Sequence, residues 1–452
     1  MSTGKELAAE KMRAKGVDAT AVKIFENYWD HLATGATGMI PEDTITPLTT
    51  PDTLDENMVA DDDDLAALEL TVQIKLNGGL GTSMGLSGPK SLLPVVDGHT
   101  FLDIMVRQVL YARHWYGARL PLIFLDSFNT RETTLEALKA YPDLAVEDIP
   151  LDMMQSEEPK LLQSDLTPAT WPANPDLEWC PPGHGDLYPT LLDSGILDLL
   201  IDKGFRYASV SNGDNLGAAP SPVLAGWFAR TGAPFAAEIT LRTPMDVKGG
   251  HLATRKADDR LILRESAQTP QDELVYFTDA SIHPYAHCNN LWFDLVALRA
   301  KLEETDGVLN LPLIRNSKTV DPTDADSPAV YQIECAMGAA IESFEGATAI
   351  AVPRSRFLPV KTTNELTLLR SDVFEMGEDF IPRATTSPLP VVALPKVYAK
   401  MNDYEARLPY PLSLNDCRTL TVEGDWTFGE HVDVIGDVVL GPEGGKIDGR
   451  VE

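Results

Sequence analysis

The most distinctive candidate for chemistry is a glycine-rich stretch that follows an apolar segment and reads "KLNGGLGTSMGLSGPKS", from Lys75 to Ser91. Glycines at this density leave backbone N–H groups uncovered, so that these groups can approach phosphate oxygens closely. Two common phosphate loops do not fit. Pro89 interrupts the Gly-Lys-Ser order of a Walker A loop, and Met84 stands where the dinucleotide-binding pattern has its third glycine. A flexible turn is the alternative, but strand, glycines and Lys90 together predict a nucleotide loop of another type.

Four other stretches place polar side chains beside glycines or next to strands. His184 lies between glycines in "PPGHGD", which leave its ring little to pack against. Asp214 follows an apolar strand in "SNGDNLG", where it suits Mg²⁺, although an Asx turn has the same composition. Asn289 and Asn290 precede an apolar strand in "CNNLWFDL", and Lys361 follows one in "LPVKTTNEL". Each of these signals is weak when taken singly.

The elements that must position these residues have the rhythm of an α/β domain. Apolar segments at 72–76, 122–125 and 207–210 alternate with helical stretches at 101–116 and 131–141. This alternation predicts a largely parallel sheet. Ligands bind at the carboxyl ends of the strands in such sheets, which is where the glycine-rich stretch and Asp214 fall.

The two ends of the chain have other patterns. Apolar residues recur at helical spacing over 3–34, which predicts a helical N-terminal segment and linker over 1–69. The nucleotide-binding domain is then expected over 70–382. Short valine-rich strands separated by glycine turns predict a β-helix over 383–452, and the alternative there is an ordinary small β-domain.

Composition restricts the class of protein. The 452 residues carry a net charge of −31, which argues against partners such as nucleic acid and anionic membranes, because like charges repel. No apolar run approaches the length that crosses a bilayer, and residues 1–16 lack the apolar core of a secretory signal. The four cysteines are widely scattered without metal-ligand spacing. We therefore expect reduced thiols and a cytoplasmic protein.

Taken together, these motifs resemble those of the eukaryotic-type UTP–glucose-1-phosphate uridylyltransferases. The order and spacing of the stretches quoted above carry the resemblance, which extends from about Leu70 into the tail at "LTVEGDWTFG". It implies an α/β fold with a Rossmann-like nucleotidyltransferase domain of the glycosyltransferase-A-like kind, a mixed and mostly parallel sheet, and a C-terminal left-handed β-helix. It also implies that UTP and glucose 1-phosphate react to give UDP-glucose and pyrophosphate, with Mg²⁺ as cofactor.

The resemblance also implies roles for individual residues. It assigns UTP to Leu76, Asn77, Gly78, Gly79, Lys90, Gln155, Gly183, Asp214 and Lys361. It assigns the sugar phosphate to His184, Asn212, Gly213 and Asn290. Gln155, in "MMQSEEPKL", would read uracil together with the backbone of Gly183. Asp214 would bind Mg²⁺. Lys90 and Lys361 would be the catalytic pair, with Lys361 between the two reacting phosphates.

Two alternatives remain open at this point. One is a UDP-sugar or UDP-N-acetylhexosamine pyrophosphorylase, whose glycine loop is shorter than this one and differs at 83–85. The stretch 286–288 also departs from the Phe-Asn-Thr that often begins the asparagine motif of the uridylyltransferases. The other is a non-catalytic nucleotide-sugar binding protein, against which the presence of both lysines and Asp214 argues. A homo-oligomer is compatible with the resemblance, and sequence does not fix the oligomeric state.

Overall fold

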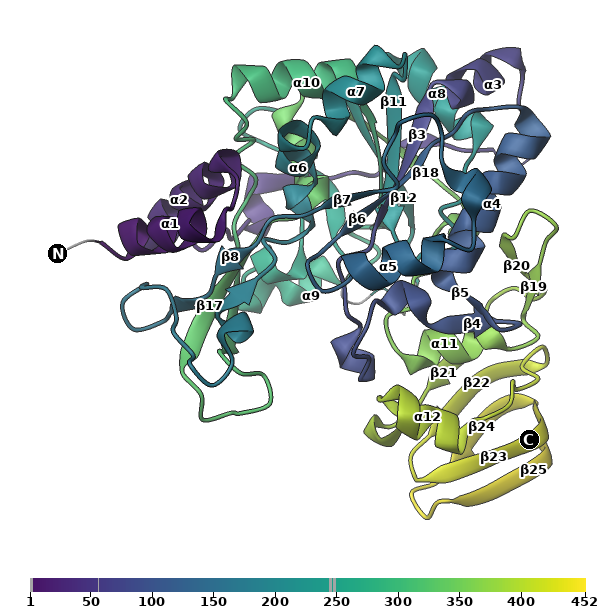
Figure 1. The fold of residues 1–452 in the computed structure, drawn as a ribbon. Helices are drawn as coiled ribbons and strands as arrows, with labels where there is room; N and C mark the ends of the chain where they lie inside the picture. The colour runs from purple at the N-terminus through teal and green to yellow at the C-terminus, as the bar shows by residue number, and fades with distance from the viewer. Residues whose placement is uncertain (1–2, 56, 244–245, 247–248) are drawn as a thin grey trace.

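The computed structural model describes residues 3–55, 57–243, 246 and 249–452, and it shows a mixed α/β architecture (Figure 1). Its α-helices are α1 (Gly4–Lys15), α2 (Ala19–Ala33), α3 (Asp62–Glu69), α4 (Phe101–Tyr116), α5 (Arg131–Leu138), α6 (Leu187–Asp193), α7 (Ile196–Asp202), α8 (Pro222–Thr231), α9 (Leu274–Phe277), α10 (Leu295–Glu304), α11 (Thr363–Arg370) and α12 (Met401–Arg407). The predicted helices at 101–116 and 131–141 correspond to α4 and α5.

An eight-stranded sheet forms the centre of the molecule. In spatial order its strands are β2 (Asp52–Thr53), β18 (Thr348–Ala351), β12 (Phe235–Leu241), β15 (Tyr285–Asp294), β11 (Tyr207–Asn212), β3 (Thr71–Leu76), β6 (Leu122–Asp126) and β7 (Asp152–Met154). All neighbouring strands are parallel except where β15 pairs antiparallel with both β11 and β12. The predicted sheet, mixed and mostly parallel, is confirmed.

Helices cover both faces of this sheet, which explains why its central strands are buried along nearly their whole length rather than at every second residue. On one face the core includes side chains of α3, α4 and α8, and on the other it includes those of α6, α7 and α10. Figure 1 shows these two groups of helices around the central strands. With both faces closed, ligands can approach only at the strand ends.

A buried lysine lies in this sheet. Lys75, on β3, is 1% exposed, and its ammonium donates to Ser211 Oγ and to the carbonyl oxygen of Ala218, both at 2.7 Å. Burial lowers the pKa of Lys75 to about 7. The two acceptors tie the end of β3 to Ser211 near the end of β11 and to Ala218 in the loop that follows it.

The N-terminal segment is helical, as its apolar spacing predicts. Helix α1 begins with a capping box between Thr3 and Glu6 and ends at Gly16, whose φ of 87° is in the left-handed region. Helix α2 buries Val22 and Phe25 in the core on the same side of the sheet as α6. The helices therefore pack on the central domain rather than standing apart (Figure 1).

The C-terminal strands pair in parallel. Strands β21 (Val391–Ala393), β22 (Cys417–Val422) and β24 (Gly436–Leu440) form one sheet, and β23 (Trp426–Val434) with β25 (Gly445–Val451) forms another. From β22 to β25, successive strands thus alternate between two parallel sheets, as they do in coils of a β-solenoid. The left-handed β-helix itself stays a prediction. Helix α12, whose Met401 and Tyr404 are buried, was not predicted.

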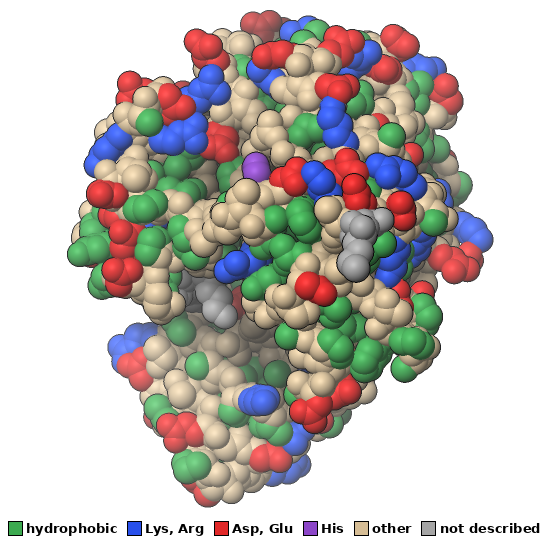
Figure 2. Space-filling model, turned by 90° about the vertical axis from the view of Figure 1, so that its left-hand side faces the viewer, with side chains coloured by type: hydrophobic (Ala, Val, Ile, Leu, Met, Phe, Trp, Pro, Cys, Tyr) green, Lys and Arg blue, Asp and Glu red, His purple; other side chains and the backbone are tan. Residues whose placement is uncertain are grey.

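The remaining strands form small sheets and hairpins around the centre. They are β1 (Ile45–Pro47), β4 (Pro94–Val96), β5 (His99–Thr100), β8 (Glu158–Pro159), β9 (Leu161–Leu162), β10 (Trp179–Cys180), β13 (His251–Arg255), β14 (Leu261–Arg264), β16 (Ile314–Thr319), β17 (Ala329–Glu334), β19 (Phe374–Met376) and β20 (Pro382–Ala384). Among the described residues, no helix has the length and apolar character needed to span a membrane. On the face in Figure 2, Lys and Arg side chains are interspersed with acidic ones.

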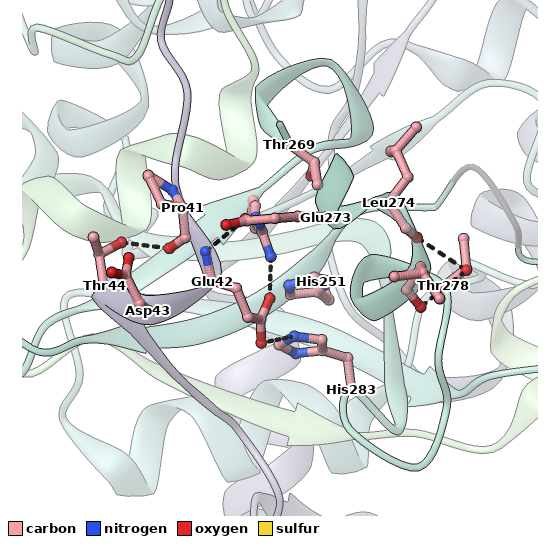
Figure 3. A network of polar contacts seen from close by, with 12 residues as sticks. Pro41, Glu42, Asp43, Thr44, His251, Thr269, Glu273, Leu274, Thr278 and His283 are labelled. Atoms are coloured by element: carbon pink, nitrogen blue, oxygen red, sulfur yellow. Dashed lines mark hydrogen bonds and ion pairs between the residues drawn. The ribbon is translucent and has the colours of Figure 1, made fainter. Parts of the chain in front are cut away.

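A buried polar cluster fastens the segment between α2 and β1 to the central domain (Figure 3). Glu42 accepts a hydrogen bond from Arg264, and its other carboxylate oxygen lies 3.0 Å from His283 Nε2. Arg264 also donates to Glu273 at 2.8 Å, and that carboxylate accepts from the backbone N–H of Glu42 at 2.7 Å. The ring of His251 stacks on that of His283 with centroids 3.7 Å apart. Both rings are 1% exposed.

From this cluster we predict that the free energy of unfolding falls in mild acid. Burial, followed by the charges of His283, Arg242 and Arg264, lowers the pKa of His251 to about 2. The folded chain therefore binds fewer protons than the unfolded chain, so the stability that neutral His251 contributes is present above about pH 6.5 and is lost as pH falls below it. Between pH 7.5 and 5.5 the wild type should lose about 1.4 kcal/mol more than His251→Phe does.

Urea unfolding of both proteins at the two pH values measures this difference, and titrating groups common to both cancel. The matched control is His431→Phe, because His431 is exposed on the C-terminal sheets. An equal loss of stability in the wild type and in His251→Phe would contradict the prediction.

Candidate active site

The predicted residues meet, with one exception, in a single pocket of about 290 Å³. It lies at the carboxyl ends of β3, β6, β7 and β11, where parallel strands of such sheets bind ligands. Its lining includes Leu76, Asn77, Gly78, Gly79, Lys90, Gln155, Gly183, His184, Asn212, Gly213, Asp214 and Lys361. Residues more than 280 positions apart in the chain thus share one site.

The glycine-rich stretch forms the wall next to Gln155. A Cβ atom added at Gly78 would lie 2.5 Å from the side-chain nitrogen Nε2 of Gln155, closer than real contacts allow. Only a glycine lets the backbone approach the Gln155 amide this closely. The stretch then folds back, since the backbone N–H of Lys90 donates to the carbonyl oxygen of Gly79 at 3.1 Å.

A hydrogen-bond network behind this wall was not predicted from sequence. Asp126, at the end of β6, is fully buried and accepts from the side-chain amide of Asn77 at 2.6 Å. Its backbone carbonyl accepts from the N–H of Gln155 at 2.8 Å, and Ser127 Oγ donates to the carbonyl of Gly78 at 2.9 Å. Burial raises the pKa of Asp126 to about 6. The network holds three pocket residues in one arrangement.

The turn "PPGHGD" is held against the residues before η9 (Met337–Ser343), a 3₁₀ helix. The backbone N–H of Cys335 donates to Pro182 at 3.1 Å, and that of Gly185 donates to Cys335 at 2.9 Å. Gly183 has a φ of 81°, and a Cβ there would lie 2.7 Å from the carbonyl oxygen of Cys335. Asp186 then accepts from the backbone N–H of Ser156 at 2.6 Å, which links this turn to the neighbour of Gln155.

The geometry fixes the tautomer of His184. Its Nδ1 accepts a hydrogen bond from the backbone N–H of Met337 at 2.9 Å. Burial, together with the charge of Lys361, lowers the pKa of His184 to about 4. The ring is therefore neutral at physiological pH, and its hydrogen is on Nε2. His184 can offer one neutral N–H donor to the pocket that it lines.

Three charged residues form the electrostatic centre of the pocket. Asp214 accepts from Lys90 Nζ at 2.7 Å and from Lys361 Nζ at 3.0 Å. Lys90 also donates to the carbonyl oxygen of Val360, next to Lys361. Burial alone would raise the pKa of Asp214, but the charges of Lys361 and Lys90 outweigh it and lower that pKa. The carboxylate is ionised, and the group carries one net positive charge.

The exception is Asn290, which the structure does not bring to the pocket. Its side-chain amide donates to Glu238 at 3.0 Å and its oxygen accepts from Asn215 at 3.1 Å, inside the sheet. The preceding residue, Asn289, has a φ of 55°, and its amide donates to the pocket residue Asn212 at 2.9 Å. The register of β15 against β12 shifts at this point. A shift of register exchanges the sides to which successive side chains point, so Asn289 rather than Asn290 is directed to the pocket residue. Asn289 is thus the asparagine that reaches a pocket residue.

Sequence reasoning also missed other residues of the lining, which are Ser91, Leu125, Pro181 and Glu334. Leu125 pairs with the predicted Leu76 across the sheet, Pro181 lies two residues before Gly183, and neither offers a polar side chain. Glu334, at the end of β17, directly precedes Cys335, whose backbone is bonded to the turn "PPGHGD". Burial raises the pKa of Glu334. Ser91 follows Lys90 directly, and that adjacency is the one signal that could have found it.

A comparison with protein-family models decides the family. The model of UTP–glucose-1-phosphate uridylyltransferase matches residues 22–434 of this chain. The chain belongs to this family. The resemblance seen in its motifs is thereby confirmed, and 22–434 includes every residue assigned to the pocket.

Individual members of the uridylyltransferase family agree with this result. The UTP–glucose-1-phosphate uridylyltransferase of Saccharomyces cerevisiae is 38% identical over 379 residues, which are 83% of this chain and 74% of that protein. The enzyme of that name from Musa acuminata is 35% identical over 411 residues, 90% of this chain and 84% of that protein.

Solved structures of the family have the same fold. A variant of UDP-glucose pyrophosphorylase from Leishmania major, in complex with UDP-glucose, has a TM-score of 0.93 and 39% identity, and the match covers 100% of this chain and 98% of that chain. A UDP-glucose phosphorylase from Trypanosoma brucei has a TM-score of 0.92 and 39% identity, covering 99% and 100% of the two chains.

Proposed function

We propose that this chain transfers a uridylyl group from UTP to glucose 1-phosphate, which gives UDP-glucose and pyrophosphate. The observation that carries the proposal is the convergence of Gln155, His184 and the group of Lys90, Asp214 and Lys361 in one pocket. Family membership and the UDP-glucose bound by a relative of the same fold support it.

The chemistry needs positioning and charge screening. A phosphate oxygen of glucose 1-phosphate attacks the α-phosphorus of UTP in line, and pyrophosphate leaves from the opposite side. A phosphate monoester is already ionised at neutral pH, so neither Lys90 nor Lys361 has to act as a base. Their ammonium groups instead reduce the repulsion between two anionic substrates and stabilise charge as it moves to the leaving group.

Neutral residues complete the binding site in this proposal. The side-chain amide of Gln155 offers one donor and one acceptor for the uracil edge, beside the backbone of Gly183. The N–H at Nε2 of His184 donates to the sugar phosphate without adding charge. Asn212, at the end of β11, and Asn289, at the register shift within β15, would contact the sugar. Asn289 replaces Asn290 in this role, because Asn290 is bonded within the sheet.

Asp214 fits a role in holding Mg²⁺, which we propose as the cofactor. Among the described residues, no group of three or more His, Cys, Asp or Glu side chains could hold a metal ion. A single ionised carboxylate is nevertheless what Mg²⁺ requires when phosphates provide its other ligands. When bound, the ion neutralises charge on the phosphates. Asp214 would then contact both the ion and the two lysines.

Some finer properties remain proposals that accompany this one. They are the cytoplasmic location, self-association, the left-handed β-helix and the three domain ranges 1–69, 70–382 and 383–452. A broader sugar preference is the second candidate function. It is kept because residues 286–288 depart from the Phe-Asn-Thr that often begins the asparagine motif, and His287 in this stretch lies only two residues before Asn289, which is proposed to contact the sugar.

A pyrophosphate-release assay tests the proposed function. It crosses four nucleoside triphosphates with glucose, galactose and N-acetylglucosamine 1-phosphates, in the presence of Mg²⁺. We expect UTP with glucose 1-phosphate to be the preferred pair, because one amide beside a backbone suits uracil. A clear preference for another nucleotide, or for N-acetylglucosamine 1-phosphate, would overturn the proposal, and no turnover with any pair would favour the non-catalytic binder.

A further inference from the structure

Ser91 is a wall residue of the pocket to which the proposed function gives no role. It lies in the 3₁₀ turn η3 (Lys90–Leu92), directly after the lysine that contacts Asp214. The residue is 4% exposed, and its hydroxyl oxygen is buried without a hydrogen-bond partner among the described residues. A buried hydroxyl without a partner costs free energy and is uncommon in folded proteins.

The surroundings of this hydroxyl are otherwise satisfied. Side chains of the pocket such as Asn77, Lys90, Asn212 and Lys361 all have hydrogen-bond partners. The backbone of the turn is also bonded, since the N–H of Leu92 donates to Pro89 at 3.1 Å and that of Leu93 donates to Lys90 at 3.0 Å. The unmet hydrogen bond therefore belongs to the side chain of Ser91 and not to a strained turn.

The order of residues indicates what could satisfy it. In phosphate-binding loops a lysine that reaches the phosphates is followed by a residue whose hydroxyl serves the same anion or its metal ion. Here a glycine-rich stretch ends on Lys90 and then Ser91, although Pro89 and the 3₁₀ turn make it a different loop. A serine side chain has three staggered positions, so rotation about one torsion can turn Oγ toward the pocket.

We propose that Ser91 is a further binding residue for the nucleotide, whose hydroxyl donates a hydrogen bond to a phosphate oxygen of UTP. The inference rests on the proposed function. It explains why the loop keeps an unpaired hydroxyl in the unliganded fold, because the missing acceptor arrives with the triphosphate.

Ser91→Ala tests the inference because it should weaken UTP binding without lowering the stability of the fold. The dissociation constant for UTP with Mg²⁺, measured by calorimetry, should rise about 10-fold, as for loss of a hydrogen bond to a charged group. The melting temperature without nucleotide should stay the same or rise, because an unpaired buried hydroxyl is removed. Ser91→Thr keeps the hydroxyl and should recover part of the affinity. The control is Ser87→Ala, an exposed position of the same stretch.

Each other outcome is decisive. If the wild type binds UTP and the dissociation constant is the same in Ser91→Ala, this inference is overturned but the proposed function is not. A weaker affinity accompanied by a lower melting temperature without nucleotide, and no recovery in Ser91→Thr, would mean that the serine supports the fold rather than the ligand. Absence of UTP binding by the wild type would overturn the proposed function and this inference with it.

Discussion

Replacing Lys361 by alanine is expected to lower kcat about 100-fold, with little change in KM for UTP or for glucose 1-phosphate. The side chain is 57% exposed, and its ammonium lies 3.0 Å from Asp214 at the mouth of the pocket. Its removal therefore costs little folding free energy. If the ammonium mainly stabilises charge that develops on the way to the transition state, the loss appears in kcat.

Steady-state kinetics of Lys361→Ala measure this effect. Lys446→Ala is the matched control, because Lys446 is similarly exposed and paired with an aspartate, Asp448, on the C-terminal sheets. Lys361→Arg should restore activity only in part, since a planar guanidinium cannot take the place of a compact ammonium between two phosphates. Turnover of the alanine variant within a factor of about three of wild type, less than about 1 kcal/mol of barrier, would show that Lys361 is not catalytic.

Asp214→Asn should have an effect of similar size, and it should depend on Mg²⁺. The substitution keeps the shape but removes the charge that faces both Lys90 and Lys361. At limiting Mg²⁺ we expect turnover to fall about 100-fold or more, with partial recovery as Mg²⁺ is raised. The lowered pKa of Asp214 means that its ion pairs also stabilise the fold at neutral pH, so the melting temperature should fall, but by no more than about 4 °C.

Activity titrated against Mg²⁺, together with thermal unfolding, separates the two roles of Asp214. Asp425→Asn provides the control, because that carboxylate is 63% exposed and paired with Arg407 far from the pocket. Wild-type turnover of Asp214→Asn at limiting Mg²⁺ would leave Asp214 with a structural role in its turn. A fall in melting temperature large enough to unfold the variant at the assay temperature would lead to the same conclusion, because the lost turnover would then reflect lost folded protein.

Much of the fold could be predicted because its strongest signals are local. The strands β3, β6 and β11 coincide with the segments predicted at 72–76, 122–125 and 207–210, and α4 has the predicted bounds of 101–116. Apolar periodicity does not reveal strand direction, however, so the antiparallel β15 in the middle of the sheet was not foreseen. Helix α12 was missed because it is only seven residues long, within a stretch dominated by β signals.

The site residues likewise include some that short stretches of sequence identify and others that they do not. Residues in compact motifs, such as Gly78, Lys90 and Asp214, were assigned from short stretches of sequence. Asp126 was not, because its partners come from neighbouring strands and it stands in no motif of its own. The exchange of Asn289 for Asn290 depends on a register shift in β15, which a one-dimensional pattern cannot show.

With the role proposed for Gln155 in reading uracil, its close packing against Gly78 has a consequence for redesigning the pocket toward another nucleobase. Any side chain at 78 would occupy the space that the Gln155 amide now fills, so these two positions cannot be varied one at a time. A smaller residue at 155 would leave a gap against bare backbone, and a larger one at 78 would push the amide aside. A library that randomises the two positions jointly would therefore contain functional combinations that successive single-site selection never reaches.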